Sequence, residues 1–229
     1  MSTFQRAVLS VLALTAGFLA QTNAQAVALT EPVNPAPFAD TVLSGTTFAA
    51  RPELGGTVLE DKITNFSFGG LTGTVQNRVV RETVAGTLDF YWKIDVTGSD
   101  VQGAGVTAFR LGNFGYDNLV DADWRVDGLG TVAPTAARLF NSTGNPDGSV
   151  NFLFDDAITA GSQSRFFFLK TGATAYAETA VFDQLCGPSG CISGTTATFA
   201  PAVPEPTSYA LLMAGLAVVG AVARRRSVK

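Results

Sequence analysis

A strict two-residue alternation in the stretch GTLDFYWKIDVT, residues 86–97, constrains the fold more than any other feature of the chain. Every second residue from Leu88 to Val96 is apolar, whereas Asp89 and Lys93 lie between them. Successive side chains of a β-strand point to opposite faces, so this stretch is predicted to be a strand with one buried face.

Three further stretches support the same fold class. The alternation is patchier in LTGTVQNRVV (71–80) and SVNFLF (149–154), whereas SRFFFLKT (164–171) has apolar residues on both faces, as a central strand should. Gly-, Asn- and Asp-containing turn signals recur about every ten residues, and no long helical period occurs between residues 41 and 200. We therefore predict an all-β fold, an antiparallel, jelly-roll-like β-sandwich of about eight to ten strands.

The first 26 residues have the order of a secretory signal peptide. Arg6 is followed by a mostly apolar run and then by a polar stretch that ends Ala24-Gln25-Ala26. A small-x-small ending of this kind is typical of a cleavage site, here after Ala26. The apolar run is short for a membrane span, and no basic cluster follows it. A cleaved signal helix and a mature N-terminus at Val27 are predicted.

The other end of the chain has a different apolar segment. Residues 208–223 are 16 residues without charge, and Arg224, Arg225 and Arg226 follow. As a helix the segment would reach about 24 Å, somewhat less than a hydrocarbon core of about 30 Å, which snorkelling arginines and bilayer thinning accommodate. A helix of a water-soluble core would have a polar face, and this one has none. A transmembrane helix with its basic end in the cytoplasm is predicted.

Val203, Pro204, Glu205 and Pro206 stand directly before this helix. The Pro-Glu-Pro, the apolar helix and the terminal arginines, in this order at the end of an exported chain, resemble the sorting signal of PEP-CTERM proteins. That family is exported by Gram-negative bacteria that make extracellular polysaccharide. The resemblance implies that an exosortase, a membrane-embedded cysteine protease, cuts near the prolines. Two prolines suit such a site because they keep the segment extended and outside any helix or sheet.

The implied route has signal peptidase and exosortase as processing partners and the inner membrane as a temporary one. The protein would pass through an inner-membrane intermediate with a cytoplasmic C-terminus and end at the cell surface or outside the cell. The predicted segments are a signal peptide (1–26), a Pro-rich lead-in linker (27–40), a β-sandwich domain (41–200), a sorting motif (201–207), a transmembrane helix (208–223) and a basic tail (224–229).

The charge of the chain changes when the terminal segments are left out. Residues 27–202 carry ten Lys and Arg against 18 Asp and Glu, a net charge of −8, compared with −4 for the whole chain. An acidic domain repels phosphate backbones, so nucleic acid is excluded as a partner. The 17 phenylalanines are predicted to fill the core rather than to form a ligand platform.

The chain contains no histidine, which removes Ser-His-Asp and Cys-His catalysis and the usual zinc sites. No catalytic, cofactor-binding or metal-binding residue is predicted. Glycoside hydrolysis needs only two carboxyl groups about 5–10 Å apart. The adjacent pairs Glu60/Asp61 and Asp155/Asp156 suit it poorly, because neighbours in a strand point to opposite faces. Acids from different strands could still meet.

A calcium site is a further alternative, since calcium takes several oxygen ligands from loops. The stretches DNLVDADWRVDG and NSTGNPDGSVN supply oxygen-bearing side chains: Asp117, Asp121, Asp123, Asp127, Asn145 and Asp147. Neither has the EF-hand spacing, and turn-forming Asp and Asn explain both without a metal.

The only two cysteines, Cys186 and Cys191, flank a Gly-Pro-Ser-Gly turn. In an exported protein this spacing predicts a disulfide, because the compartment is oxidising and a redox pair would normally be spaced C-x-x-C.

Taken together, these features predict an exported, non-enzymatic protein of the cell surface or extracellular matrix, with a structural or glycan-binding role in exopolysaccharide or biofilm. The alternative is a surface glycan hydrolase that uses two carboxylates. Two acids inside a cleft would favour the hydrolase, whereas a flat or shallow face would favour the binding protein.

Overall fold

The computed structural model describes residues 27–33, 36–115, 119–140, 149–187 and 190–202. Within them the chain is all-β, with twelve strands and one short 3-10 helix, η1 (Pro52–Leu54). The alternation pattern predicted about eight to ten strands. β9 (Ser162–Gln163) is an example of a strand that such a pattern cannot reveal, because it has only two residues.

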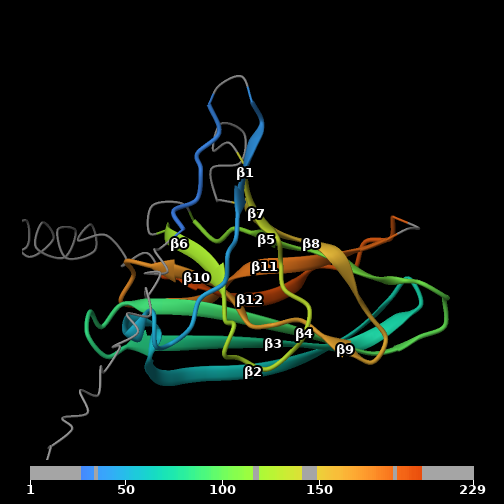
Figure 1. The fold of residues 1–229 in the computed structure, drawn as a ribbon, viewed down its shortest axis with the longest axis horizontal. Helices are drawn as coiled ribbons and strands as arrows, with labels where there is room; N and C mark the ends of the chain where they lie inside the picture. Colours follow the sequence, from blue (N-terminus) through green and yellow to red (C-terminus); the bar gives the residue numbers. More distant parts are fainter. Residues whose placement is uncertain (1–26, 34–35, 116–118, 141–148, 188–189, 203–229) are drawn as a thin grey trace, which may run out of the picture.

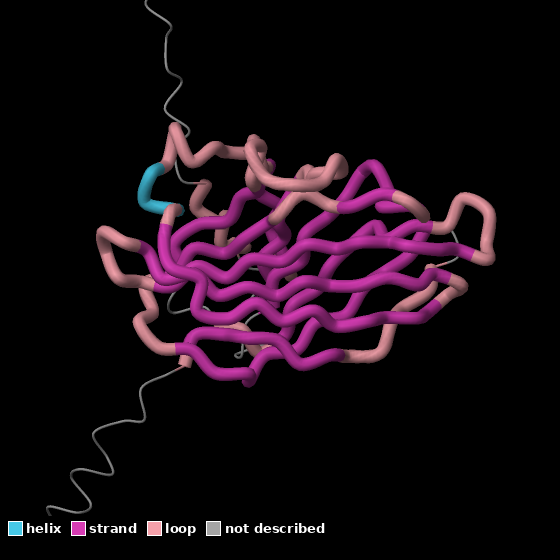
Figure 2. Tube along the Cα trace, turned by 90° about the horizontal axis from the view of Figure 1, so that it is seen from below, coloured by secondary structure: helices cyan, strands magenta, loops and turns pink. Residues whose placement is uncertain are grey.

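The strands form two sheets whose strand pairings are all antiparallel. The first sheet has the order β1 (Phe38–Val42), β7 (Ala136–Phe140), β8 (Ser149–Thr159), β5 (Gly105–Gly112), β11 (Tyr176–Gly187) and β12 (Thr196–Pro201). The second has the order β2 (Gly56–Phe68), β3 (Leu71–Glu82), β4 (Leu88–Ser99), β10 (Phe167–Thr171) and β6 (Leu119–Trp124), and β9 pairs with β4. Figure 1 shows β2, β3 and β4 beneath β5, β8 and β11, and Figure 2 shows η1 at one end of the strands.

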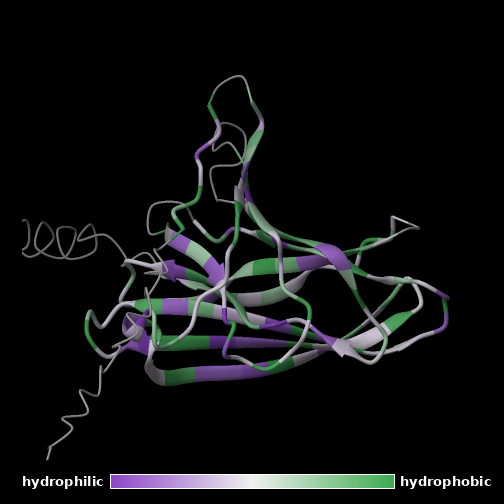
Figure 3. Ribbon diagram, viewed as in Figure 1, coloured by the Kyte–Doolittle hydropathy of each residue, from purple (hydrophilic) through white to green (hydrophobic). Residues whose placement is uncertain are grey.

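One hydrophobic core lies between the sheets and takes residues from both. Hydrophobic and hydrophilic bands alternate along the strands in Figure 3, as the sequence pattern predicts. The predicted inward face of β4 is confirmed, because Leu88, Phe90, Trp92, Ile94 and Val96 are all buried in this core. Aromatic rings join the two layers, and the centre of this contact is the ring of Phe167 from β10.

β10 is a central strand with two buried faces, as predicted for SRFFFLKT. Phe167 and Leu169 point into the core between the sheets. Phe168 points the other way and belongs to a smaller cluster with Leu54 and Tyr91. The second sheet is therefore covered on its outer face as well, which matters for the sites described below.

The chain joins the domain earlier than the predicted lead-in linker suggests. β1 begins at Phe38, inside the 27–40 segment. The carbonyl of Val27 accepts a hydrogen bond from the Ala122 amide (3.1 Å), and the Thr30 amide donates to Thr41 Oγ1 (2.8 Å). The first residue after the predicted signal cleavage site is thus attached to β6.

Cys186 and Cys191 form a disulfide, with Cα atoms 5.1 Å apart. The bond lies against the turn between β2 and β3, because a Cβ placed on Gly69 would approach the sulfur of Cys191 closer than any normal contact. Gly69 also has a φ of +54°, so glycine suits this position for two reasons. The disulfide closes the loop after β11 and packs against a turn of the opposite sheet.

Replacing Cys186 and Cys191 together by serine should lower the free energy of unfolding by only about 2 kcal/mol, because the closed loop is short. Secretion and the fold should be retained. Urea unfolding of the exported protein, with the wild type measured in parallel, gives the difference. Loss of the secreted protein would show that the bond is required for folding, contrary to this expectation.

Candidate functional site

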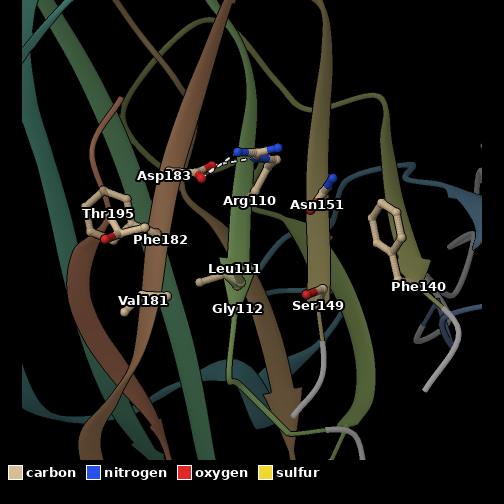
Figure 4. Close-up of a pocket in the computed structure, with 10 residues that line it drawn as sticks. All are labelled: Arg110, Leu111, Gly112, Phe140, Ser149, Asn151, Val181, Phe182, Asp183 and Thr195. Carbon is tan, nitrogen blue, oxygen red and sulfur yellow. Dashed lines mark hydrogen bonds and ion pairs between the residues drawn. The ribbon is translucent and has the colours of Figure 1, made fainter. Parts of the chain in front are cut away.

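A shallow hollow of about 230 Å³ lies on the outer face of the first sheet. We call it the outer hollow, and Figure 4 shows its side chains. Its lining residues are Arg110, Leu111, Gly112, Phe140, Ser149, Asn151, Val181, Phe182, Asp183 and Thr195. Strands β5, β7, β8 and β11 supply most of them, so the hollow has a rigid floor of paired strands.

A row of polar side chains crosses this face, because the strand register places them opposite one another on neighbouring strands. Asp40, Arg138, Asn151, Arg110 and Asp183 are consecutive cross-strand partners from β1 to β11. Directly opposite residues of antiparallel strands have neighbouring side chains on one face. The sequence positions of the five are far apart, so no local motif announces the row.

Two bidentate arginine–carboxylate pairs occupy the row. Arg110 donates from Nε and Nη2 to Asp183, both at 2.5 Å, and Arg138 donates to Asp40 at 2.6 and 2.8 Å. The hydrogen bond from Arg138 lowers the pKa of Asp40, and the bond to Asp183 raises the pKa of Arg110. Arg110, Arg138 and Asp40 are therefore charged at neutral pH, and the two pairs present planar donors and acceptors at the surface.

A second unusual site lies on the outer face of the second sheet. We call it the charged cluster, and its members are Arg51, Glu53, Glu82, Asp89, Asp121, Asp123 and Lys170. Residues 43–55, which connect β1 to β2, lie over it. The Gly45 amide donates to Asp123 (2.8 Å), and Arg51 reaches Asp121 from the same segment.

Arg51 anchors residues 43–55 to the sheet, and its side chain is only 2% exposed. Its Nη1 and Nη2 donate to the two oxygens of Asp121, each at 3.0 Å, and its Nε donates to Glu53 at 2.9 Å. Burial raises the pKa of Asp121 even though the Arg51 charge acts in the opposite direction. Burial likewise raises the pKa of Asp123.

Asp89 is fully buried, and neither of its carboxyl oxygens has a hydrogen-bond partner among the described residues. Burial, followed by the nearby charge of Asp121, raises the pKa of Asp89 to about 8. Its carboxyl group is therefore protonated at neutral pH. An unpartnered buried polar group is costly, so this residue needs an explanation beyond stability.

Acids from different strands do meet in this protein, but not in an open cleft. The acids of β3, β4 and β6 lie beneath residues 43–55, where Asp89 and Asp121 have no exposed surface. The adjacent pair Glu60/Asp61 behaves as the strand pattern predicts. Asp61 accepts hydrogen bonds from Gln76 and Arg78, whereas Glu60 accepts one from Tyr176 of the other sheet.

The candidate calcium ligands are not gathered at one place in the described part of the chain. Asp121 pairs with Arg51, Asp123 accepts from Gly45, and Asp127 pairs with Arg125. Within the described residues no group of three or more acids or cysteines is arranged to hold a metal ion. Asp117, Asn145 and Asp147 lie outside the described residues.

The signal and sorting residues, 1–26 and 203–229, also lie outside the described residues. Among the residues that the structure covers, no helix is long and apolar enough to cross a membrane. The helices predicted at both ends of the chain therefore stay predictions.

Comparison with known families identifies the C-terminal segment. Residues 202–226 match the family described as the PEP-CTERM protein-sorting motif, a range that includes Val203–Pro206 and Arg224–Arg226. No curated protein and no solved structure matches the chain. The chain carries the PEP-CTERM sorting motif, as its resemblance predicted. The motif implies export to the cell surface and processing by an exosortase.

Proposed function

We propose that the protein is a non-enzymatic, glycan-binding component of the extracellular matrix, in which the outer hollow holds exopolysaccharide. The sorting motif supports the destination, because it implies export to the cell surface. The domain that would arrive there is a β-sandwich, a description supported by two antiparallel sheets with a shared core. Its jelly-roll-like connectivity stays a prediction.

The observation that carries the proposal is the combination of side chains in the outer hollow. Arg110, Asp183 and Asn151 offer donors and acceptors side by side in one cross-strand row, which suits the vicinal hydroxyl groups of a sugar. Phe140 adds an apolar ring beyond Asn151, where the C–H face of a pyranose could pack (Figure 4). The hollow is shallow, as a site for an extended polymer should be.

The geometry gives less support to hydrolysis. A glycosidase needs two carboxyl groups about 5–10 Å apart on either side of the scissile bond. Asp183 is the only carboxylate among the described residues that line the hollow, and both of its oxygens accept hydrogen bonds from Arg110. The acids of the charged cluster are covered by residues 43–55.

The proposed route to the surface follows the sorting motif. Signal peptidase would remove residues 1–26, and residues 208–223 would hold an inner-membrane intermediate with Arg224–Arg226 in the cytoplasm. Cleavage by the exosortase near Pro204–Pro206 would then free the domain.

The test is a binding and hydrolysis screen of the exported protein against the exopolysaccharide of its host. Arg110→Lys should weaken binding about tenfold or more. Lysine cannot keep the bidentate contact that orients Asp183, and it lacks the planar donors of the guanidinium group. Arg78→Lys is the matched control, since Arg78 also pairs with a partly exposed aspartate but lies on the other sheet. It should leave affinity unchanged.

Two results would contradict the proposal. Equal affinity of wild type and Arg110→Lys would place any binding site elsewhere. Release of new reducing ends by the wild type, abolished by Asp183→Asn, would identify a hydrolase.

A further inference from the structure

An ion pair in the charged cluster is buried more deeply than its residue types normally tolerate. Lys170 of β10 pairs with Glu82 of β3, and their side chains are only 15% and 1% exposed. The carboxyl oxygens of Glu82 have no hydrogen bond besides this ion pair in the described residues. Taking two charges out of water is unfavourable unless further hydrogen bonds compensate.

Asp89 lies between the two partners in the sheet. β4 separates β3 from β10, and Asp89 is the direct cross-strand partner of Lys170 on one side and of Val80 on the other. Glu82 follows Val80 by two residues, so it occupies the diagonal position on the same face. The ammonium group of Lys170 thus reaches Glu82 past the unpartnered carboxyl group of Asp89.

The surroundings weaken the charged forms of Lys170 and Asp89. Burial, followed by the charge of Arg51, lowers the pKa of Lys170. Phe168 and Tyr91 lie beside them on β10 and β4, and residues 43–55 exclude water from above. The charged groups that face Asp89 are Lys170, Glu82 and Asp121 in the sheet, and Arg51, Glu53 and Arg125 from the connecting segments.

We propose that Lys170 and Glu82 join in an intramolecular amide bond once the domain has folded, with Asp89 relaying the proton between them. The bond would cross-link β3 to β10 over the intervening strand. It would turn a buried ion pair into a neutral group and would strengthen the sheet that carries the cover segment.

The atoms and charges of this step balance without a further reactant. Nζ of Lys170 forms a bond to Cδ of Glu82, and the bond from Cδ to one carboxyl oxygen breaks. That oxygen leaves as water with two protons from the ammonium group, while the third stays on the amide nitrogen. Asp89 gives its proton to the leaving oxygen and takes one from Nζ, so it ends unchanged. No atom is oxidised or reduced.

Proximity and burial both favour the reaction. The two groups are held in contact by the strand register, which replaces a bimolecular encounter by an intramolecular one. Burial lowers the pKa of Lys170 and so favours its neutral amine, which is the nucleophilic form. The amide needs less solvation than the ion pair that it replaces.

The test is the intact mass of the exported protein, measured after denaturation and reduction. It should be lower than the mass calculated from the processed sequence by one water molecule. Trypsin should fail to cut after Lys170, and the peptide that contains Lys170 should stay joined to residues 82–93. Fragment ions within residues 82–93 distinguish Glu82 from Asp89 as the linked residue.

Substitutions test the role of each partner. Lys170→Arg keeps the charge but cannot form the amide, so it should restore the calculated mass. Asp89→Asn should lose most of the cross-linked form, Asp89→Glu should recover part of it, and the control Asp95→Asn on the same strand should keep all of it. The wild-type mass decides the matter even if a variant does not fold. A mass equal to the calculated one, or a link to Asp89 or Asp121, would overturn the proposal.

Discussion

Replacing Arg51 by methionine should lower the free energy of unfolding by about 3–5 kcal/mol. The side chain is buried and donates two hydrogen bonds to Asp121, which has no exposed surface of its own. Without the guanidinium group, Asp121 would be left as an unpaired buried carboxylate. The change would also release residues 43–55 from the second sheet. The midpoint of urea unfolding, at unchanged slope, measures the loss.

Arg138→Met is the matched control for this prediction. Arg138 makes the same bidentate contact with Asp40, but that pair is partly exposed on the outer face of the first sheet. An exposed pair contributes only about 0–1 kcal/mol. Removing both buried partners, Arg51→Met with Asp121→Leu, should recover much of the loss, because no buried charge is left unpaired. Similar losses for Arg51→Met and Arg138→Met would show that burial is not the cause.

Changing Pro204, Glu205 and Pro206 together to alanine should trap the protein in the inner membrane with its tail intact. The sorting motif spans residues 202–226, and the prolines keep the expected cut site extended and accessible. Alanine would let the apolar helix extend into this stretch. Mass spectrometry of the C-terminal peptide, in membrane and surface fractions, distinguishes the long form from the cut one.

A double change to alanine at Glu31 and Pro32 is the control, because it removes similar residues from the other end of the domain. It should leave sorting unaffected. Deleting Arg224–Arg226 should weaken retention in the membrane, since these charges hold the C-terminus in the cytoplasm. A wild-type surface protein that still ended in Lys229 would mean that the tail is a permanent anchor.

Sequence reasoning predicted the strands whose inner face is strongly apolar. β4, β10 and β8 could be recognised because the shared core demands apolar residues at every second position. β2 does not need apolar residues at every second position. It is an edge strand of its sheet, and its side chains are exposed or half-buried. Its pattern is therefore weak although it is the longest strand.

The charged cluster could not be predicted, because its burial depends on a segment far away in the sequence. The alternation correctly assigned Asp89 and Tyr91 to the outer face of β4, a face that is normally solvated in an antiparallel sheet. Residues 43–55 cover that face, and Arg51 anchors the cover. Asp121 and Asp123 of β6 were interpreted as turn formers or calcium ligands, because the sequence does not show that residues 43–55 cover them.

The outer hollow also could not be predicted from the sequence, for a different reason. A flat or shallow face was named only as the sign of a binding protein, and its position depends on which strands become neighbours. Asp183 and Arg110 lie 73 residues apart and meet only through the pairing of β11 with β5. Pairing order is a property of the whole topology, and no local pattern encodes it.

The last strand of the domain ends only a few residues before the predicted membrane helix. β12 ends at Pro201, and the Ala202 amide still donates to the carbonyl of Ala175. In the proposed anchored intermediate, six residue steps connect Ala202 to Ser208. Each step spans at most about 3.5 Å, so this linker reaches about 20 Å at most. In that intermediate the C-terminal end of β12 would lie within about 20 Å of the bilayer, and the exosortase would have to reach its cut site within that distance.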